Sequence, residues 1–239
     1  METRSRFILR RIHWSLALKA LALAAFWLFL PGWAFLILSL YFYFVPVFHP
    51  WKLFLPFLVF LFLAFASPMN FGFALMLAAL FYMILGIKDL IFIDRRSVYE
   101  ILVLILIFLL HIWFFANLGS LPGSVSLLSA FLLSAVSCLL YRESLSYGNN
   151  LWFTAGPSKN GTMTLWLVWL LISQVSLAAL FLPLNFLYQS ALAFFLSATL
   201  FGLLSLSAND VITRARVLLY FSASFVFLVT LLGLAPWGV

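Results

Sequence analysis

Long runs of apolar residues, interrupted by short polar, proline- and glycine-containing segments, dominate the pattern along the chain. An α-helix needs about 17 to 25 apolar residues to cross the hydrocarbon core of a bilayer, and the last five runs reach that length. The pattern therefore predicts an all-α, polytopic integral membrane helix bundle with about nine transmembrane helices. The runs cover residues 14–30, 33–45, 52–66, 71–87, 98–116, 124–141, 163–182, 186–207 and 216–234.

The second and third runs, 33–45 and 52–66, are short for a full crossing, and Pro56 lies inside the third. Three interpretations stay open for them: a re-entrant segment, a kinked helix, or boundaries that the pattern defines poorly. If both runs fail to cross, the other helices keep their orientation. We therefore predict seven to nine spans.

Composition excludes a soluble protein. Hydrophobic residues make up 67% of the chain and charged residues 8%, whereas soluble domains carry about 25% charged residues. The excess of apolar residues must face lipid, and the 29 Phe and nine Trp suit hydrocarbon and headgroups. We expect a single transmembrane domain over residues 1–239. The longest non-apolar stretch, 142–162, is rich in glycine and is interpreted as a loop rather than a soluble domain.

The distribution of charge predicts the orientation. If the N-terminus is cytoplasmic, every basic residue except Lys19 falls in a cytoplasmic segment, as do all acidic residues. Lys19 lies close enough to the start of the first run to extend back to the interface. The positive-inside rule therefore favours a cytoplasmic N-terminus and an extracytoplasmic C-terminus. The connections on the other side carry no charge: residues 31–32, 67–70, 117–123 and 183–185.

The net charge of +7 is concentrated in short loops between apolar runs. This placement indicates attraction to anionic lipids at the cytoplasmic face rather than nucleic-acid binding. The first run lacks a small-residue cleavage site, so we expect it to be retained. The lone cysteine excludes a disulfide within the chain. We expect a plasma-membrane protein, and the charge pattern favours a bacterial or archaeal inner membrane.

Two polar residues stand well inside apolar runs. At a rise of about 1.5 Å per residue, His111 lies about 20 Å along its run and Gln174 about 16 Å along its own, so the two could meet at one level. A functional interpretation is a polar spot for a substrate or a proton. We favour the structural alternative, an interhelical hydrogen bond.

Charged residues gather at the cytoplasmic ends of the runs, where they could form structural ion pairs or hold a divalent ion. No Asp-rich signature, HExxH, GxSxG or phosphate-binding glycine loop is present. We therefore favour a structural layer and expect no metal, no cofactor and no catalytic residue. The layer comprises Lys88, Asp89, Asp94, Arg95, Arg96, Glu100, Arg142, Glu143, Asp210, Arg214 and Arg216.

Small residues recur every fourth position in the sixth run, and a shorter patch lies in the eighth. Small residues at this spacing allow a neighbouring helix to approach closely. We interpret both as packing seams, within the chain or with a partner subunit. They are Ser126, Ala130, Ser134 and Cys138, and then Ala198 and Gly202.

These features predict an accessory or scaffold subunit of a larger membrane assembly, possible partners being other membrane subunits. The first alternative is a small carrier or flippase for a hydrophobic or lipid-like substrate, with a cavity between the fifth and seventh runs. The second is a membrane enzyme at the cytoplasmic interface that uses several of the carboxylates. We lean against an enzyme because no catalytic motif is present.

Overall fold

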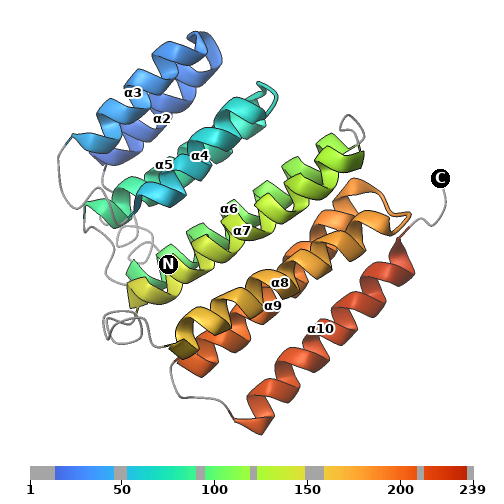
Figure 1. The fold of residues 1–239 in the computed structure, drawn as a ribbon. Helices are drawn as coiled ribbons and strands as arrows, with labels where there is room; N and C mark the ends of the chain where they lie inside the picture. Colours follow the sequence, from blue (N-terminus) through green and yellow to red (C-terminus); the bar gives the residue numbers. More distant parts are fainter. Residues whose placement is uncertain are drawn as a thin grey trace, which may run out of the picture. The chain divides into compact units, whose positions relative to one another are not determined.

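In a computed structural model, the described residues are 14–45, 53–89, 95–118, 123–148, 159–208 and 213–235, and they form nine α-helices without a strand (Figure 1). Five of these helices, α5, α6, α7, α9 and α10, are long and apolar enough to cross a membrane. The all-α class is thus confirmed for the described part of the chain. The helices are α2 (Trp14–Phe29), α3 (Gly32–Phe44), α4 (Phe54–Ala66), α5 (Phe71–Lys88), α6 (Arg95–Asn117), α7 (Gly123–Gly148), α8 (Lys159–Phe181), α9 (Phe186–Ala208) and α10 (Arg214–Leu234).

The two short runs form short helices. Helices α3 and α4 have 13 residues each, which corresponds to about 20 Å against about 30 Å of hydrocarbon. Pro56 is the third residue of α4. In the first turn of a helix the missing N–H of proline has no intrahelical partner to lose, so proline is tolerated there. Pro56 therefore belongs to the start of α4 and does not interrupt it.

Helix α7 is longer than the apolar run that predicted it. The run ends at Tyr141, whereas the helix continues to Gly148. Arg142 and Glu143 therefore lie on a helix, and the prediction of a loop that begins at residue 142 is wrong. Charged residues end an apolar run, but they do not end a helix, because Arg and Glu are good helix formers.

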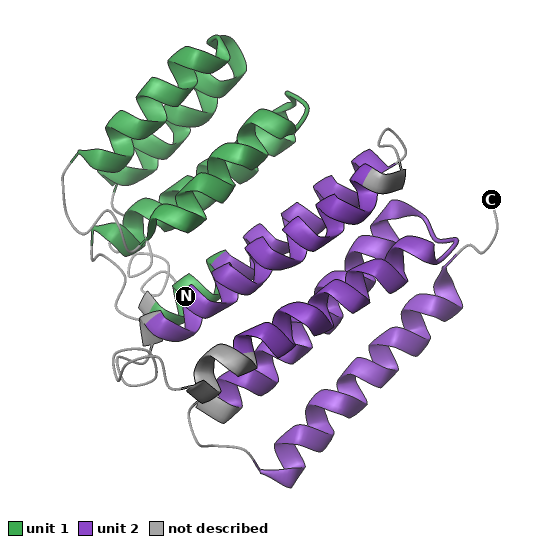
Figure 2. Ribbon diagram, viewed as in Figure 1, with its two compact units in different colours: residues 1–102 green, residues 103–239 purple. Residues whose placement is uncertain are grey.

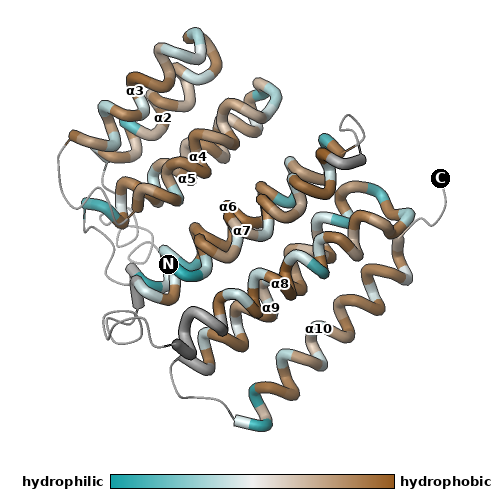
Figure 3. Tube along the Cα trace, viewed as in Figure 1, coloured by the Kyte–Doolittle hydropathy of each residue, from teal (hydrophilic) through white to brown (hydrophobic). Residues whose placement is uncertain are grey.

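The chain divides into two compact units, residues 1–102 and 103–239, with the boundary inside α6 (Figure 2). Apolar residues extend along the helices of both units, and hydrophilic residues lie mostly near helix ends (Figure 3). The described part of each unit is thus built from apolar helices. The absence of a separate soluble domain stays a prediction, because residues 149–158 lie outside the described part.

In the first unit, α2 packs mainly against α5, while α3 contacts α2 and α4 contacts α5. Aromatic rings fill the space between these helices: Tyr43 stacks on Phe57 with ring centroids 4.0 Å apart, and Phe60 stacks on Phe81 at 5.5 Å. The indole Nε1 of Trp27 donates a hydrogen bond to the carbonyl of Ala64, 2.8 Å away. Large aromatic surfaces and one directional bond therefore hold α2 and α4 in position.

In the second unit, α7 packs on α8, α8 on α9, and α9 on α10. Helices α8 and α9 lie side by side, and α10 follows next to α9 (Figure 1). Phe108 of α6 contacts Phe194 of α9 at a centroid distance of 4.9 Å, and Phe195 stacks on Phe227 of α10 at 3.8 Å. Helix α9 thus joins α6 and α10 through neighbouring phenylalanines.

Candidate functional site

Lys88, the last residue of α5, is buried, with 2% of its side chain exposed. Its ammonium donates a hydrogen bond to the carbonyl of Tyr43 in the last turn of α3, and it also lies 5.2 Å from the centre of the Tyr43 ring. The last carbonyls of a helix have no intrahelical donor and carry partial negative charge. Lys88 therefore supplies the donor and the positive charge that the end of α3 lacks.

Two charged groups act on Lys88 by Coulomb interaction: Asp89 attracts it and Lys19 of α2 repels it. The Oδ1 atom of Asp89 is buried and has no hydrogen-bond partner. The Lys88 hydrogen bond joins the ends of two helices of the first unit, α3 and α5. We interpret Lys88 as a structural residue, because its ammonium is already bound by the carbonyl and the ring of Tyr43.

The rest of the charged layer is more open. Arg96 Nε bonds to Glu100 Oε1 at 3.0 Å, one turn apart on α6, and both side chains are about one third exposed. Surface pairs of this kind contribute about 0.3–0.5 kcal/mol. Arg95 begins α6, but its side chain lies outside the described residues, as do Asp94 and Asp210 entirely.

In the second unit, Arg142 is exposed and Glu143 is half-buried on α7. Arg214 and Arg216 are exposed at the start of α10, where the Thr213 hydroxyl accepts a hydrogen bond from the Arg216 N–H. Among the described residues, no three His, Cys, Asp or Glu side chains gather where they could hold a metal ion.

His111 is fully enclosed on α6, with 0% of its side chain exposed. Its Nδ1 lies 2.8 Å from the carbonyl of Ile107 one turn earlier, and its Nε2 is buried without a partner. The hydroxyl of Ser190 on α9 donates to the backbone carbonyl of His111 at 3.3 Å. His111 is therefore part of the α6–α9 contact.

Gln174 does not meet His111. It lies on an exposed face of α8, and among the side-chain amides that the structure describes it alone has no hydrogen-bond partner. Its neighbours on that face are apolar and exposed. They are Leu167, Leu170, Leu171 and Phe181, with exposed fractions of 52%, 46%, 41% and 74%, and Ala178.

The small residues of α7 all point inward: Ser126, Ala130, Ser134 and Cys138 are buried. The thiol of Cys138 donates to the carbonyl of Leu165 on α8, with 3.6 Å between sulfur and oxygen. Contact with a backbone atom requires close approach of the two helices. In the structure, this stripe therefore lies at a contact within the chain.

Gly202 marks a second close approach. A Cβ atom at this position would clash with the ring of Tyr220 on α10 and would lie 3.0 Å from its Cζ. Ala198, one turn earlier on α9, is half-buried. The missing side chain of Gly202 thus provides the space that the Tyr220 ring occupies.

Sequence reasoning missed the aromatic hydroxyl of Tyr141. Its oxygen lies 3.2 Å from the Ser197 hydroxyl on α9, and its ring stacks on Phe201 at 4.5 Å. Tyr141 was interpreted as the end of an apolar run. Tyrosine at the end of an apolar run is typical of a membrane interface, so nothing in the sequence indicated that the Tyr141 hydroxyl is buried against α9.

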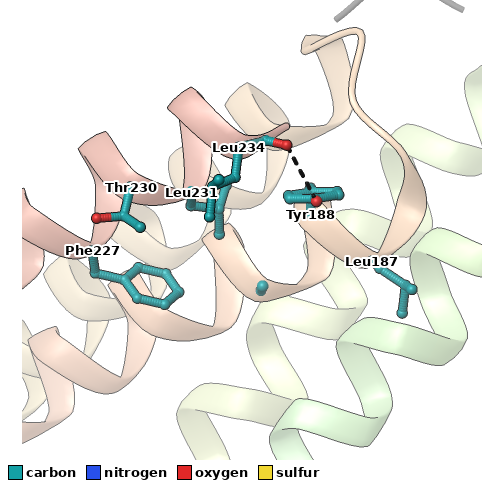
Figure 4. A pocket seen from close by; sticks show the side chains of 7 residues that line it. Leu187, Tyr188, Phe227, Thr230, Leu231 and Leu234 are labelled. Atoms are coloured by element: carbon teal, nitrogen blue, oxygen red, sulfur yellow. Dashed lines mark hydrogen bonds between the residues drawn. The ribbon is translucent and has the colours of Figure 1, made fainter. Parts of the chain in front are cut away.

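A groove of about 390 Å³ lies between the first turns of α9 and the last turns of α10. The Tyr188 hydroxyl donates a hydrogen bond to the Leu234 carbonyl, 3.4 Å away, which is the dashed line in Figure 4. The walls of the groove are almost entirely apolar, so it suits a hydrocarbon chain better than a polar ligand. The lining residues are Leu187, Tyr188, Ala191, Phe227, Thr230, Leu231 and Leu234.

The chain matches no protein-family model, no curated protein and no solved structure.

Proposed function

We propose that this protein is an accessory or scaffold subunit of a larger membrane assembly, and that the exposed face of α8 takes part in the assembly. The observation that carries the proposal is the position of Gln174. It is the one described side-chain amide without a partner, and it lies among exposed apolar residues.

The depth of Gln174 makes its exposure costly. It follows the start of α8 by 15 residues, or about 22 Å, and stands about 6 Å from the middle of the helix. At this depth a bilayer offers no water, and leaving an amide unpaired costs about 2–7 kcal/mol. A neighbouring subunit that offers a donor and an acceptor would remove this cost.

The buried polar groups support the same proposal. Lys88 bonds to Tyr43 and His111 to Ile107 on its own helix. The Lys88 bond ties α5 to α3, whereas a path for protons or polar cargo needs polar groups that are free to bind them. The polar pair on which the carrier alternative depended, His111 with Gln174, is not formed in the structure.

Gentle solubilisation followed by identification of co-purifying proteins tests the proposal. We expect stoichiometric membrane partners with the wild-type protein and their loss with Gln174→Leu. Thr230→Val is the matched control, because the Thr230 hydroxyl is exposed but already bonded to Val226 on its own helix. A wild-type protein that purifies alone as a monomer contradicts the proposal.

We further infer that the chain crosses the membrane nine times from a cytoplasmic N-terminus, with its basic loops against anionic lipids of a bacterial or archaeal plasma membrane. The segregation of basic residues supports this topology. Reporter fusions after residues 89 and 182 test the orientation. The first fusion is expected to report the cytoplasm and the second the opposite side, and the reverse pattern contradicts the orientation.

The groove between α9 and α10 favours a second candidate function, the carriage of a lipid-like molecule. Its volume and apolar lining suit an acyl chain. Proteoliposomes with fluorescent phospholipid in one leaflet test this candidate. Transbilayer movement that Ala191→Phe blocks would favour a carrier over a scaffold, and movement no faster than in empty liposomes excludes it.

A further inference from the structure

We infer that the exposed face of α8 is a dimer interface that takes the same face of a second copy of this chain. This inference rests on the proposal that the α8 face takes part in an assembly, and it names the partner. We call this face the α8 stripe, which consists of Leu167, Leu171, Gln174, Ala178 and Phe181.

The α8 stripe has the spacing of a helix-pairing seam. Its residues follow one another in alternating steps of four and three, an average of about 3.5 residues, which is the period of a left-handed helix pair. All five are exposed. The stripe spans 15 residues, from Leu167 to Phe181, and extends over about 21 Å, which is most of the hydrocarbon thickness.

Gln174 selects a second copy as the occupant. A side-chain amide has both a donor and an acceptor, so two glutamines facing each other satisfy each other. Copies of one membrane protein share one orientation, and a two-fold axis along the membrane normal brings Gln174 of each copy to the same depth. Any other partner would need a polar residue at the matching level, whereas a second copy supplies it by symmetry.

The neighbouring residues fit the same geometry. Ala178 lies one turn after Gln174, and small residues allow two helix backbones to approach closely. Leu171 lies on the same stripe, one turn before Gln174. The amide pair would therefore be enclosed by apolar contacts, which shield its hydrogen bonds from competing groups.

Helix α10 differs from α8 in the state of its exposed polar groups. Its surface is also exposed and apolar, but its exposed hydroxyls are already bonded within the helix: Ser222 to Leu219 and Thr230 to Val226. Lipid can cover this surface at no polar cost. On the stripe of α8, lipid would leave the amide of Gln174 unpaired.

Cysteine cross-linking of the full chain in its native membrane tests the inference. In a Cys138→Ala background, one cysteine is placed at each stripe position, for example Leu171→Cys or Gln174→Cys, and the membranes are oxidised. We expect disulfide-linked dimers at stripe positions and none at Trp166→Cys, an exposed residue of α8 outside the stripe. Val229→Cys on exposed α10 is a second control. Equal cross-linking at stripe and control positions, or no dimer, overturns the inference.

Energy transfer between labelled copies in liposomes measures the contribution of the amide. Interhelical hydrogen bonds in membranes are modest, so Gln174→Leu should weaken dimerisation by about three- to tenfold, with Gln174→Asn between the two. Gln174 is exposed, so these variants should fold, which an unchanged unfolding temperature would verify. Unchanged dimerisation in Gln174→Leu overturns the role of the amide pair.

The failure of the inference is distinguishable from failure of the proposed function. If Gln174→Cys cross-links to a different protein and never to itself, the second copy is excluded but the assembly proposal stands. If the chain stays monomeric in liposomes and Gln174→Leu changes no co-purifying partner, both are excluded.

Discussion

Lys88 at the end of α5 donates a hydrogen bond from its ammonium to the carbonyl of Tyr43 in the last turn of α3, 45 residues earlier in the chain. A buried lysine is rare and is tolerated only when it is paired. The Tyr43 ring lies on Phe57 of α4. One cation thus joins α3 and α5 at a point where α4 also contributes.

Replacing this cation should destabilise the protein. Lys88→Met keeps much of the volume but leaves the Tyr43 carbonyl without this donor, so we expect a loss of about 1.5–3 kcal/mol in the free energy of unfolding. Thermal unfolding in mild detergent measures it. Lys19→Met is the control and should be neutral or slightly stabilising, because Lys19 repels Lys88. Equal unfolding temperatures for wild type and Lys88→Met would show that the bond contributes nothing.

A side chain at Gly202 should destabilise the α9–α10 contact, because the Tyr220 ring would have to shift. Gly202→Ala places a Cβ against the Tyr220 ring, and the resulting overpacking should cost about 1–3 kcal/mol. Gly233→Ala is the matched control, since nothing lies within 4 Å of a Cβ there, and it should be neutral or stabilise by up to about 1 kcal/mol. Comparison of their unfolding temperatures checks the difference.

A double variant shows whether the clash itself is responsible. Tyr220→Ala removes the ring that a Cβ at Gly202 would meet. In the background of Tyr220→Ala, the change Gly202→Ala should therefore cost little or nothing. Additive losses in the double variant would mean that the glycine is required for another reason.

His111→Leu should be neutral or stabilising. The buried Nε2 has no partner in the structure, and replacing an unsatisfied polar group by an apolar one of similar shape removes a desolvation penalty of about 1–3 kcal/mol. The helical backbone bonds of α6 remain. A clear drop in unfolding temperature would instead reveal that Nε2 is engaged by a water molecule or a ligand.

Tyr141→Phe should cost about 0.5–1.5 kcal/mol, the contribution of a single neutral hydrogen bond. The ring and its stacking on Phe201 are kept, and Ser197 retains its bond to the Phe194 carbonyl. Tyr188→Phe is the control, because its bond to the Leu234 carbonyl is long and exposed. An equal effect of the two changes would show that burial of the Tyr141 hydroxyl adds nothing.

Helix positions follow closely from the sequence. The run 71–87 became α5 at Phe71–Lys88, and the run 216–234 became α10 at Arg214–Leu234. The end of α7 was missed by seven residues because Arg142 and Glu143 interrupt hydrophobicity without interrupting the helix. Apolar runs locate the part of a helix that suits lipid, whereas hydrogen bonding decides where the helix ends.

The directions of side chains did not follow from the sequence. The sequence allowed Gln174 to meet His111 at one level, yet Gln174 lies on an exposed face of α8. Lys88 was assigned to a structural layer of charged residues at the helix ends, and the structure buries its side chain against α3. A soluble helix reveals its inner face by its apolar stripe. These helices are apolar all round, so their periodicity carries little information about which face is inside.

The sequence by itself determined the all-α class and the approximate position of each apolar helix, because helix formation and burial of apolar surface depend on local composition. Only the tertiary structure decided which helices meet, and hence which polar groups are satisfied. Lys88 donates its hydrogen bond to a carbonyl of α3, and the Tyr220 ring packs against Gly202. Gln174 finds no acceptor on any described residue of its own chain. These outcomes depend on contacts between residues far apart in sequence, where apolar surfaces of similar chemistry are distinguished by shape and by single hydrogen bonds.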